Sequence, residues 1–173
     1  MTSEEREEDI NYWWNGGFSG AFFMDSLDNP VEPKLKAAFR RVLLAMPDED
    51  YHGFLTLRPQ VVCQPVLDGT LWSYRRPVMP GQTEIRIYVL YFAPEVGTYS
   101  EERLTSTVAH ETAHLILGHV GGTAAGHGEA HAEELTDRKV ESWGFKAAYT
   151  DAERRELAER HRRARERSQQ PKR

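Results

Sequence analysis

Residues 107–120 read TVAHETAHLILGHV, and this stretch carries the strongest indication of the fold. It contains the pattern HExxH, with His110, Glu111 and His114. Side chains four residues apart on a helix lie on one face, about 6 Å apart, so both imidazoles can bind one tetrahedral cation. Glu111 follows the first histidine, where it can contact a water on that cation rather than the cation itself. The stretch therefore predicts a metal site on a helix.

The ends of this helix are marked by capping signals. Thr98 and Glu101 have the spacing of a capping box, and Ser100 is a competing N-cap, so the helix should begin near residues 99–101. A glycine at 118 is a natural C-terminal stop. Beyond the first turn, Glu111 is the only Asp, Glu, Lys or Arg, which implies that protein covers most of the helix. Burying an unpaired charge is costly, so a carboxylate on such a helix is expected to have an ionic or hydrogen-bonding partner or a functional role.

A second helix is predicted over residues 129–143, ended by Gly144. It carries Glu133 and Asp137, which lie four apart and on one face. Glu133 could be the third metal ligand, while Asp137 accepts a ring N–H of a ligand histidine and so fixes its tautomer. The glycine-rich loop over residues 118–128 is long enough to fold this helix back across the first.

Other side chains compete for the third position. Glu134 would serve if the second helix were rotated, and His127 and His131 are also four apart. Asp137 itself is a further candidate. His119 should lie too far round the first helix to share the histidine face, and is interpreted as a C-terminal capping residue.

HExxH followed by a helix with ExxxD resembles the gluzincin class of zinc metallopeptidases. The run HETAHLILGH is similar to the small soluble ImmA/IrrE-like metallopeptidases, and the resemblance covers residues 84–145. The extended metzincin motif is excluded, because it needs glycine and histidine where this chain has Leu117 and Val120. The resemblance implies a small sheet above the active-site helix, Zn²⁺ as cofactor, and cleavage of a protein or peptide substrate, often a bacterial regulator.

The expected reaction is metal-assisted hydrolysis. Zinc lowers the pKa of its bound water from about 15.7 toward 7, and Glu111 accepts that proton as general base and passes it to the leaving amine. Tyr149 or Tyr99 could donate a hydrogen bond to the developing oxyanion. The strand predicted over Glu84–Phe92 is either an edge strand that binds the substrate or an ordinary central strand.

Upstream of the motif, apolar runs and turn signals predict a small antiparallel sheet. The runs are Phe54–Cys63, Leu71–Tyr74 and Glu84–Phe92, separated by Asp68-Gly69 and Pro80-Gly81. An amphipathic helix over residues 34–46 ends before Pro47. We therefore expect an α+β fold, in which the sheet packs on the HExxH helix and on the second ligand-bearing helix.

The length of 173 residues suits a single core domain. Residues 1–10 hold five acidic side chains, so residues 1–11 are predicted to be a disordered leader. Residues 12–149 would form the minimal zincin-like domain, with an irregular aromatic segment over residues 12–23. Residues 150–173 would form a charged, Arg-rich helix that begins with a capping box at Thr150 and Glu153.

Charge and composition limit the classes of partner and the cellular location that we expect. The net charge of −5 argues against nucleic-acid binding by the whole chain, and glutamates among the arginines of residues 150–173 allow pairs within that helix. No apolar stretch approaches the roughly 20 residues of a membrane span. The acidic N-terminus does not resemble a secretory signal, and the single Cys63 cannot form an internal disulfide, so we expect a cytoplasmic location.

Two alternative functions stay open. One is a metal-stabilised module without catalysis, and the other is binding of nucleic acid or a partner by the Arg-rich helix.

Overall fold

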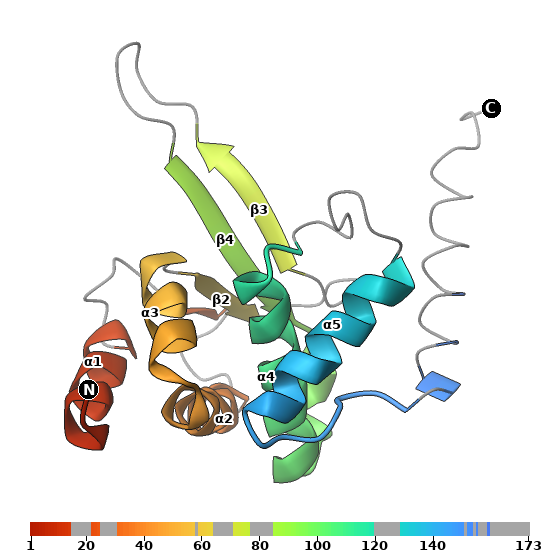
Figure 1. The fold of residues 1–173 in the computed structure, drawn as a ribbon, viewed down its shortest axis with the longest axis horizontal. Helices are drawn as coiled ribbons and strands as arrows, with labels where there is room; N and C mark the ends of the chain where they lie inside the picture. The colour runs from red at the N-terminus through yellow and green to blue at the C-terminus, as the bar shows by residue number, and fades with distance from the viewer. Residues whose placement is uncertain are drawn as a thin grey trace.

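The described part of the chain consists of helices and one small sheet, which is the α+β class that the sequence predicts (Figure 1). The computed structural model describes residues 1–14, 22–24, 31–57, 59–63, 71–76, 85–119 and 129–150, together with positions 152, 153, 155 and 159. The elements are α1 Ser3–Trp14, β1 Phe22–Met24, α2 Glu32–Ala45, α3 Asp48–Leu57, β2 Gln60–Cys63, β3 Leu71–Arg76, β4 Ile85–Phe92, the 3-10 helix η1 Pro94–Thr98, α4 Glu101–Ile116 and α5 Glu129–Ser142.

The sheet is mixed, with the strand order β1-β2-β4-β3. Parallel pairs join β1 to β2 and β2 to β4, whereas β3 and β4 are antiparallel, with Trp72 opposite Val89. The prediction of an antiparallel sheet is therefore wrong except for β3 and β4. The connection from β1 to β2 contains α2 and α3, and a crossover of this kind returns the chain in its original direction. Apolar runs alone carry no information about strand direction.

Strand β4 lies inside the sheet, paired with β2 on one side and with β3 on the other. Val89 and Leu90 have partners on both sides, whereas Ile85–Tyr88 pair only with β3 among the described strands. The interpretation of Glu84–Phe92 as a central strand is therefore confirmed at Val89 and Leu90, and that of a substrate-binding edge stays a prediction for the first half of the strand. Among the described strands, β1 and β3 form the edges of the sheet.

Helix α3 occupies the start of the predicted strand Phe54–Cys63, of which only β2 is extended. Acidic residues at 48–50 follow Pro47 and fill the first helical turn, where negative charge is stabilising. Tyr51 and Phe54 then lie three residues apart and are buried. The apolar residues here follow a helical period, which a short run cannot distinguish from a strand.

The first residues of the chain form helix α1, so the prediction of a disordered leader over residues 1–11 is wrong. Arg6, Ile10 and Trp13 have helical spacing and are buried, while most of the acidic side chains lie at the surface. The Arg6 guanidinium donates hydrogen bonds to the main-chain carbonyls of Leu43, Leu44 and Met46, at 3.1, 3.2 and 2.6 Å. It thereby satisfies carbonyls at the C-terminal end of α2 that have no partner within the helix.

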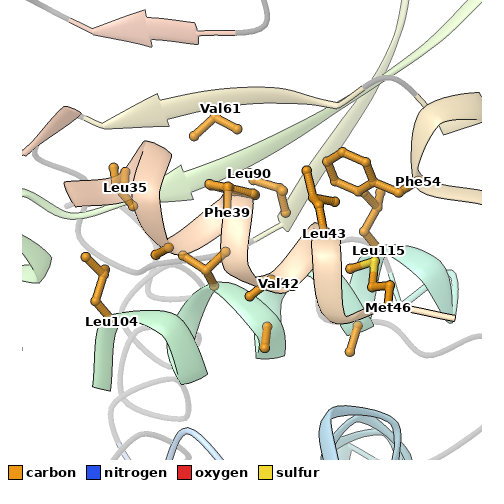
Figure 2. Packing of buried hydrophobic residues seen from close by; sticks show 14 of the residues in the cluster. Leu35, Phe39, Val42, Leu43, Met46, Phe54, Val61, Leu90, Leu104 and Leu115 are labelled. Atoms are coloured by element: carbon orange, nitrogen blue, oxygen red, sulfur yellow. The ribbon is translucent and has the colours of Figure 1, made fainter. Parts of the chain in front are cut away.

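Helix α2 lies between the sheet and α4 (Figure 2). Val61 and Leu90 reach it from the sheet, and Leu104 and Leu115 belong to the same cluster from the side of α4. The amphipathic helix predicted over residues 34–46 is confirmed. Its buried residues are Leu35, Ala38, Phe39, Val42 and Leu43. With one side of α4 covered by α2, another side is available to α5.

The boundaries predicted for α4 and α5 are confirmed. Ser100 is the N-cap of α4, and its hydroxyl accepts a backbone N–H at 3.3 Å. The Thr98 hydroxyl instead donates to a carbonyl within η1. Of the two predicted N-caps, Ser100 is therefore the one that caps α4. Gly118 and Gly144 follow the two helices with φ values of 73° and 86°, a conformation that other residues rarely adopt.

The capping box predicted after the core domain is also confirmed. The Thr150 amide donates to Glu153 Oε2 at 2.9 Å, and the Glu153 amide donates to Thr150 Oγ1 at 3.2 Å. The predicted turns at 68–69 and 80–81, residues 120–128 of the glycine-rich loop, and most positions after Glu153 lie outside the described residues. Within the described part of the chain, no helix has the length and hydropathy needed to cross a membrane.

Candidate metal centre

His110 and His114 lie one turn apart on α4 and direct their rings to the same side of the helix. Their Nε2 atoms are 3.0 Å apart, and the ring planes form an angle of 82°. Only 2% of His110 is exposed, whereas 13% of the His114 side chain reaches solvent. The spacing in HExxH thus brings two imidazole nitrogens together, as the pattern predicts.

Glu133 on α5 faces both of these nitrogens. Its Oε2 atom lies 3.2 Å from His110 Nε2, and its Oε1 atom lies 3.2 Å from His114 Nε2. Helix α5 packs across α4, which brings residues of the two helices to one place (Figure 1). One ligand atom from each of the three residues lies within 4.8 Å of the other two. The structure therefore brings together the two histidines and the glutamate that the sequence nominates as ligands.

Asp137 lies one turn after Glu133 and approaches the opposite side of the His110 ring. Its Oδ1 atom is 3.5 Å from His110 Nδ1, and both residues are buried. This position agrees with the predicted role of Asp137, in which a carboxylate behind the ring sets the tautomer of a ligand histidine. The two nitrogens of His110 thus face one carboxylate each.

The charges of these residues influence one another. Burial disfavours the charged form of His110, but interactions with the carboxylates of Asp137 and Glu133 outweigh burial and raise the pKa of His110 to about 9. Burial also disfavours the Glu133 carboxylate, and its hydrogen bonds with His110 and His114 lower the pKa of Glu133 far below its usual value. The site therefore favours a positive charge at the point where the nitrogens and the carboxylate meet.

Glu111 is partly buried on α4, next to His110. Burial raises the pKa of the Glu111 carboxyl, and the charges of His110 and His114 act in the opposite direction. A raised pKa makes a carboxylate a stronger base. The charges of His110, His114 and Glu133 all act on Glu111, so its carboxyl lies in the neighbourhood of the three candidate ligands.

Tyr149, in the segment after α5, lies edge-on against His110, with ring centroids 5.2 Å apart and an angle of 89°. Burial, followed by the negative charge of Glu111, raises the pKa of Tyr149, so its hydroxyl keeps its proton at neutral pH. Tyr99, the other tyrosine considered from the sequence, lies under the Arg103 guanidinium, 4.5 Å from the centre of its ring. Tyr149 therefore contacts a candidate ligand through its ring, and Tyr99 contacts Arg103.

Comparisons of the chain with protein-family models, curated proteins and solved structures find no match. The assignment therefore depends on the donor set itself. Within the described residues, the donor set consists of two imidazole nitrogens and one carboxylate. Catalytic zinc sites characteristically have three protein ligands and a fourth position for water, whereas structural zinc sites have four protein ligands. The residues present fit a divalent cation that prefers nitrogen and oxygen ligands.

The other nominated ligands have different surroundings. His131 Nδ1 and Glu134 Oε2 are 3.7 Å apart, on side chains that are 51% and 55% exposed. Glu134 also forms an ion pair with Arg138. Asp137 faces Nδ1 of His110 rather than Nε2, and His127 lies outside the described residues. Among the described candidates, Glu133 is the carboxylate that joins the two histidines.

Thr136 and His119 contact the site, although sequence reasoning did not assign them to it. The Nδ1 atom of His114 is 3.1 Å from Thr136 Oγ1 and 3.3 Å from His119 Nδ1. The expectation that His119 lies too far round the helix is wrong, because Gly118 ends the helix and turns the chain back. The His119 amide then donates to the His114 carbonyl at 2.9 Å. Thr136 could have been found from its place three residues after Glu133, on the same side of α5.

Proposed function

We propose that this protein is a zinc metallopeptidase that hydrolyses peptide bonds of a protein or peptide substrate. The convergence of His110 Nε2, His114 Nε2 and a Glu133 carboxylate oxygen within 4.8 Å is the observation that carries the proposal. Glu111, next to the first histidine, supplies the base. The likeness to gluzincins, and to the ImmA/IrrE-like group among them, is part of the proposal, as is a cytoplasmic location, which the single cysteine favours.

Glu111 and Tyr149 would carry the proton transfer and the charge stabilisation. His110, His114 and Glu133 would hold a divalent cation, and the cation would supply Lewis acidity to the substrate carbonyl and lower the pKa of a water molecule toward neutral. Glu111 accepts a proton from the attacking water as its oxygen adds to the carbonyl carbon, and gives that proton to the amine as the C–N bond breaks. The Tyr149 hydroxyl donates a hydrogen bond to the carbonyl oxygen as negative charge develops on it.

A metal-stabilised module without catalysis is the alternative that the same three ligands allow. The set of three ligands among the described residues favours catalysis, because structural zinc sites have four protein ligands. Binding of nucleic acid or a partner by residues 150–173 stays a prediction from the sequence, since most of these residues lie outside the described ranges.

A Glu111→Gln variant tests the proposal. We expect it to bind one equivalent of Zn²⁺ as the wild type does, and to cleave a mixed peptide library about 100-fold more slowly or worse, as measured by mass spectrometry. Glu102→Gln is the matched control, because Glu102 lies on the same helix, is exposed and pairs with Lys146. Unchanged cleavage by Glu111→Gln would exclude Glu111 as the base. A zinc-loaded wild type that cleaves none of the peptides would favour the module without catalysis.

A further inference from the structure

Thr136 is a fully buried hydroxyl on α5, between Glu133 and Asp137 in the sequence. Its Oγ1 atom donates to the carbonyl of Ala132, four residues earlier, at 2.8 Å. A hydroxyl has a single proton, so this bond leaves Thr136 Oγ1 with acceptor capacity only. Whatever else contacts the oxygen must therefore supply a proton of its own.

Two histidine side chains contact this oxygen. Nδ1 of His114 lies 3.1 Å from Thr136 Oγ1, and Nδ1 of His119 lies 3.3 Å from it. For the contact with His114 to be a hydrogen bond, His114 Nδ1 must carry the proton. A neutral imidazole has one N–H, so Nε2 of His114 is then left with its lone pair, 3.2 Å from Glu133 Oε1.

His119 supports the same tautomer from outside the helix. Its Nδ1 atom is 3.3 Å from Nδ1 of His114, so its lone pair can accept the same His114 proton, and its 3.3 Å approach to Thr136 Oγ1 is then a contact between two acceptors and not a hydrogen bond. The turn at Gly118 and the bond from the His119 amide to the His114 carbonyl hold the His119 backbone in place. The His119 side chain is half-buried.

We propose that Thr136, supported by His119, is a positioning residue that holds His114 in the tautomer that binds metal through Nε2. The inference rests on the metal site proposed above and adds to it. Asp137 faces the equivalent nitrogen of His110, so each ligand histidine has its own partner behind the ring. Both partners are consecutive residues of α5, the helix that also carries the third ligand. Groups of this kind orient the ligands of a metal and contribute to its affinity.

Zn²⁺ titration in competition with a chromogenic chelator tests the proposal in the full chain. We expect Thr136→Val to weaken zinc binding about 10- to 100-fold, because valine has a similar shape but no oxygen. Thr136→Ser should restore most of the affinity. Thr107→Val is the matched control, because Thr107 is a buried threonine of α4 whose hydroxyl also donates to a carbonyl four residues earlier. That variant loses the same kind of bond and should bind zinc as the wild type does.

Imidazole nitrogen NMR of the zinc-loaded protein gives a readout that a merely structural role would not change. The wild type and Thr136→Ser should show an exchange-protected N–H at Nδ1 of His114, and Thr136→Val should lose this protection. His119→Ala is a second variant at a half-buried position, with a smaller loss of affinity expected, and it decides the question if Thr136→Val does not fold.

The two proposals fail in different ways. Zinc affinity unchanged in both Thr136→Val and His119→Ala, with tight binding in the wild type, would overturn the positioning role alone. A wild type that binds no zinc would overturn the metal site itself.

Discussion

The indole N–H of Trp143 donates to Asp50 Oδ2 at 2.8 Å, across 93 residues of sequence. The other oxygen of Asp50 lies 2.7 Å from the Lys139 ammonium group. One buried carboxylate on α3 thus holds two side chains near the C-terminal end of α5, the helix that carries Glu133. These two contacts tie α3 to the far end of the helix on which the third proposed ligand lies.

Replacing Asp50 should therefore loosen α5. We expect Asp50→Ala to lower the free energy of unfolding by about 1.5–3 kcal/mol, the usual loss for hydrogen bonds to a charged group. Urea unfolding followed by circular dichroism measures this. Glu49→Ala, at the exposed neighbouring position, should change it by less than about 0.5 kcal/mol. Equal effects of the two variants would show that Asp50 is not an anchor.

The raised pKa of His110 predicts opposite pH dependences for metal binding and for metal-free stability. The pKa rises from 6.5 to about 9 on folding, so the proton stabilises the metal-free fold fully below pH 6.5, and this stability is lost as the pH rises through 9. Zinc must displace the same proton, so its affinity should rise about tenfold per pH unit up to pH 9. Chelator competition between pH 7 and pH 9 measures the slope, and an affinity independent of pH would contradict it.

Tyr149 should affect turnover without affecting metal binding. We expect Tyr149→Phe to slow peptide cleavage about 100-fold, the usual loss when one donor to an oxyanion is removed, with zinc affinity unchanged. Tyr99→Phe is the natural comparison, because Tyr99 packs under Arg103. Steady-state rates on one cleaved peptide distinguish the two. A loss of rate in Tyr99→Phe instead would assign the donor to Tyr99.

Arg6 should stabilise the fold from outside the site. Its guanidinium binds three carbonyls at the end of α2, pairs with Asp48 and stacks 4.6 Å from the ring centre of Tyr51. We expect Arg6→Ala to cost about 1.5–3 kcal/mol of unfolding free energy, because buried carbonyls lose a charged donor. Thermal unfolding beside Glu8→Ala, an exposed substitution on the same helix, checks this. A midpoint shift no larger than that of Glu8→Ala would mean that solvent satisfies the carbonyls.

Much of the candidate site could be predicted because its signals are local. The spacing of His110 and His114, the caps around α4 and the repeat of Glu133 and Asp137 four residues apart are all properties of single helices. Helical periodicity fixes which side chains share a face, so the ligands could be named before their contact was known.

The incorrect predictions concern contacts between segments far apart in sequence. The helix α1 gains its stability from the end of α2, some 37–40 residues later, and its own acidic sequence does not indicate this. The parallel pairing of β1 depends on a crossover through two helices. His119 was misplaced for a different reason, since a helical wheel does not apply beyond the left-handed Gly118.

The ligand set is divided between two helices, and the third ligand is synthesised nineteen residues after His114. On the proposed chemistry, a nascent or partly folded copy has the two histidines but no docked carboxylate to complete the site. Peptidase activity would then begin only after α5 has docked on α4. A ribosome-bound or misfolded copy would therefore not cleave the proteins around it.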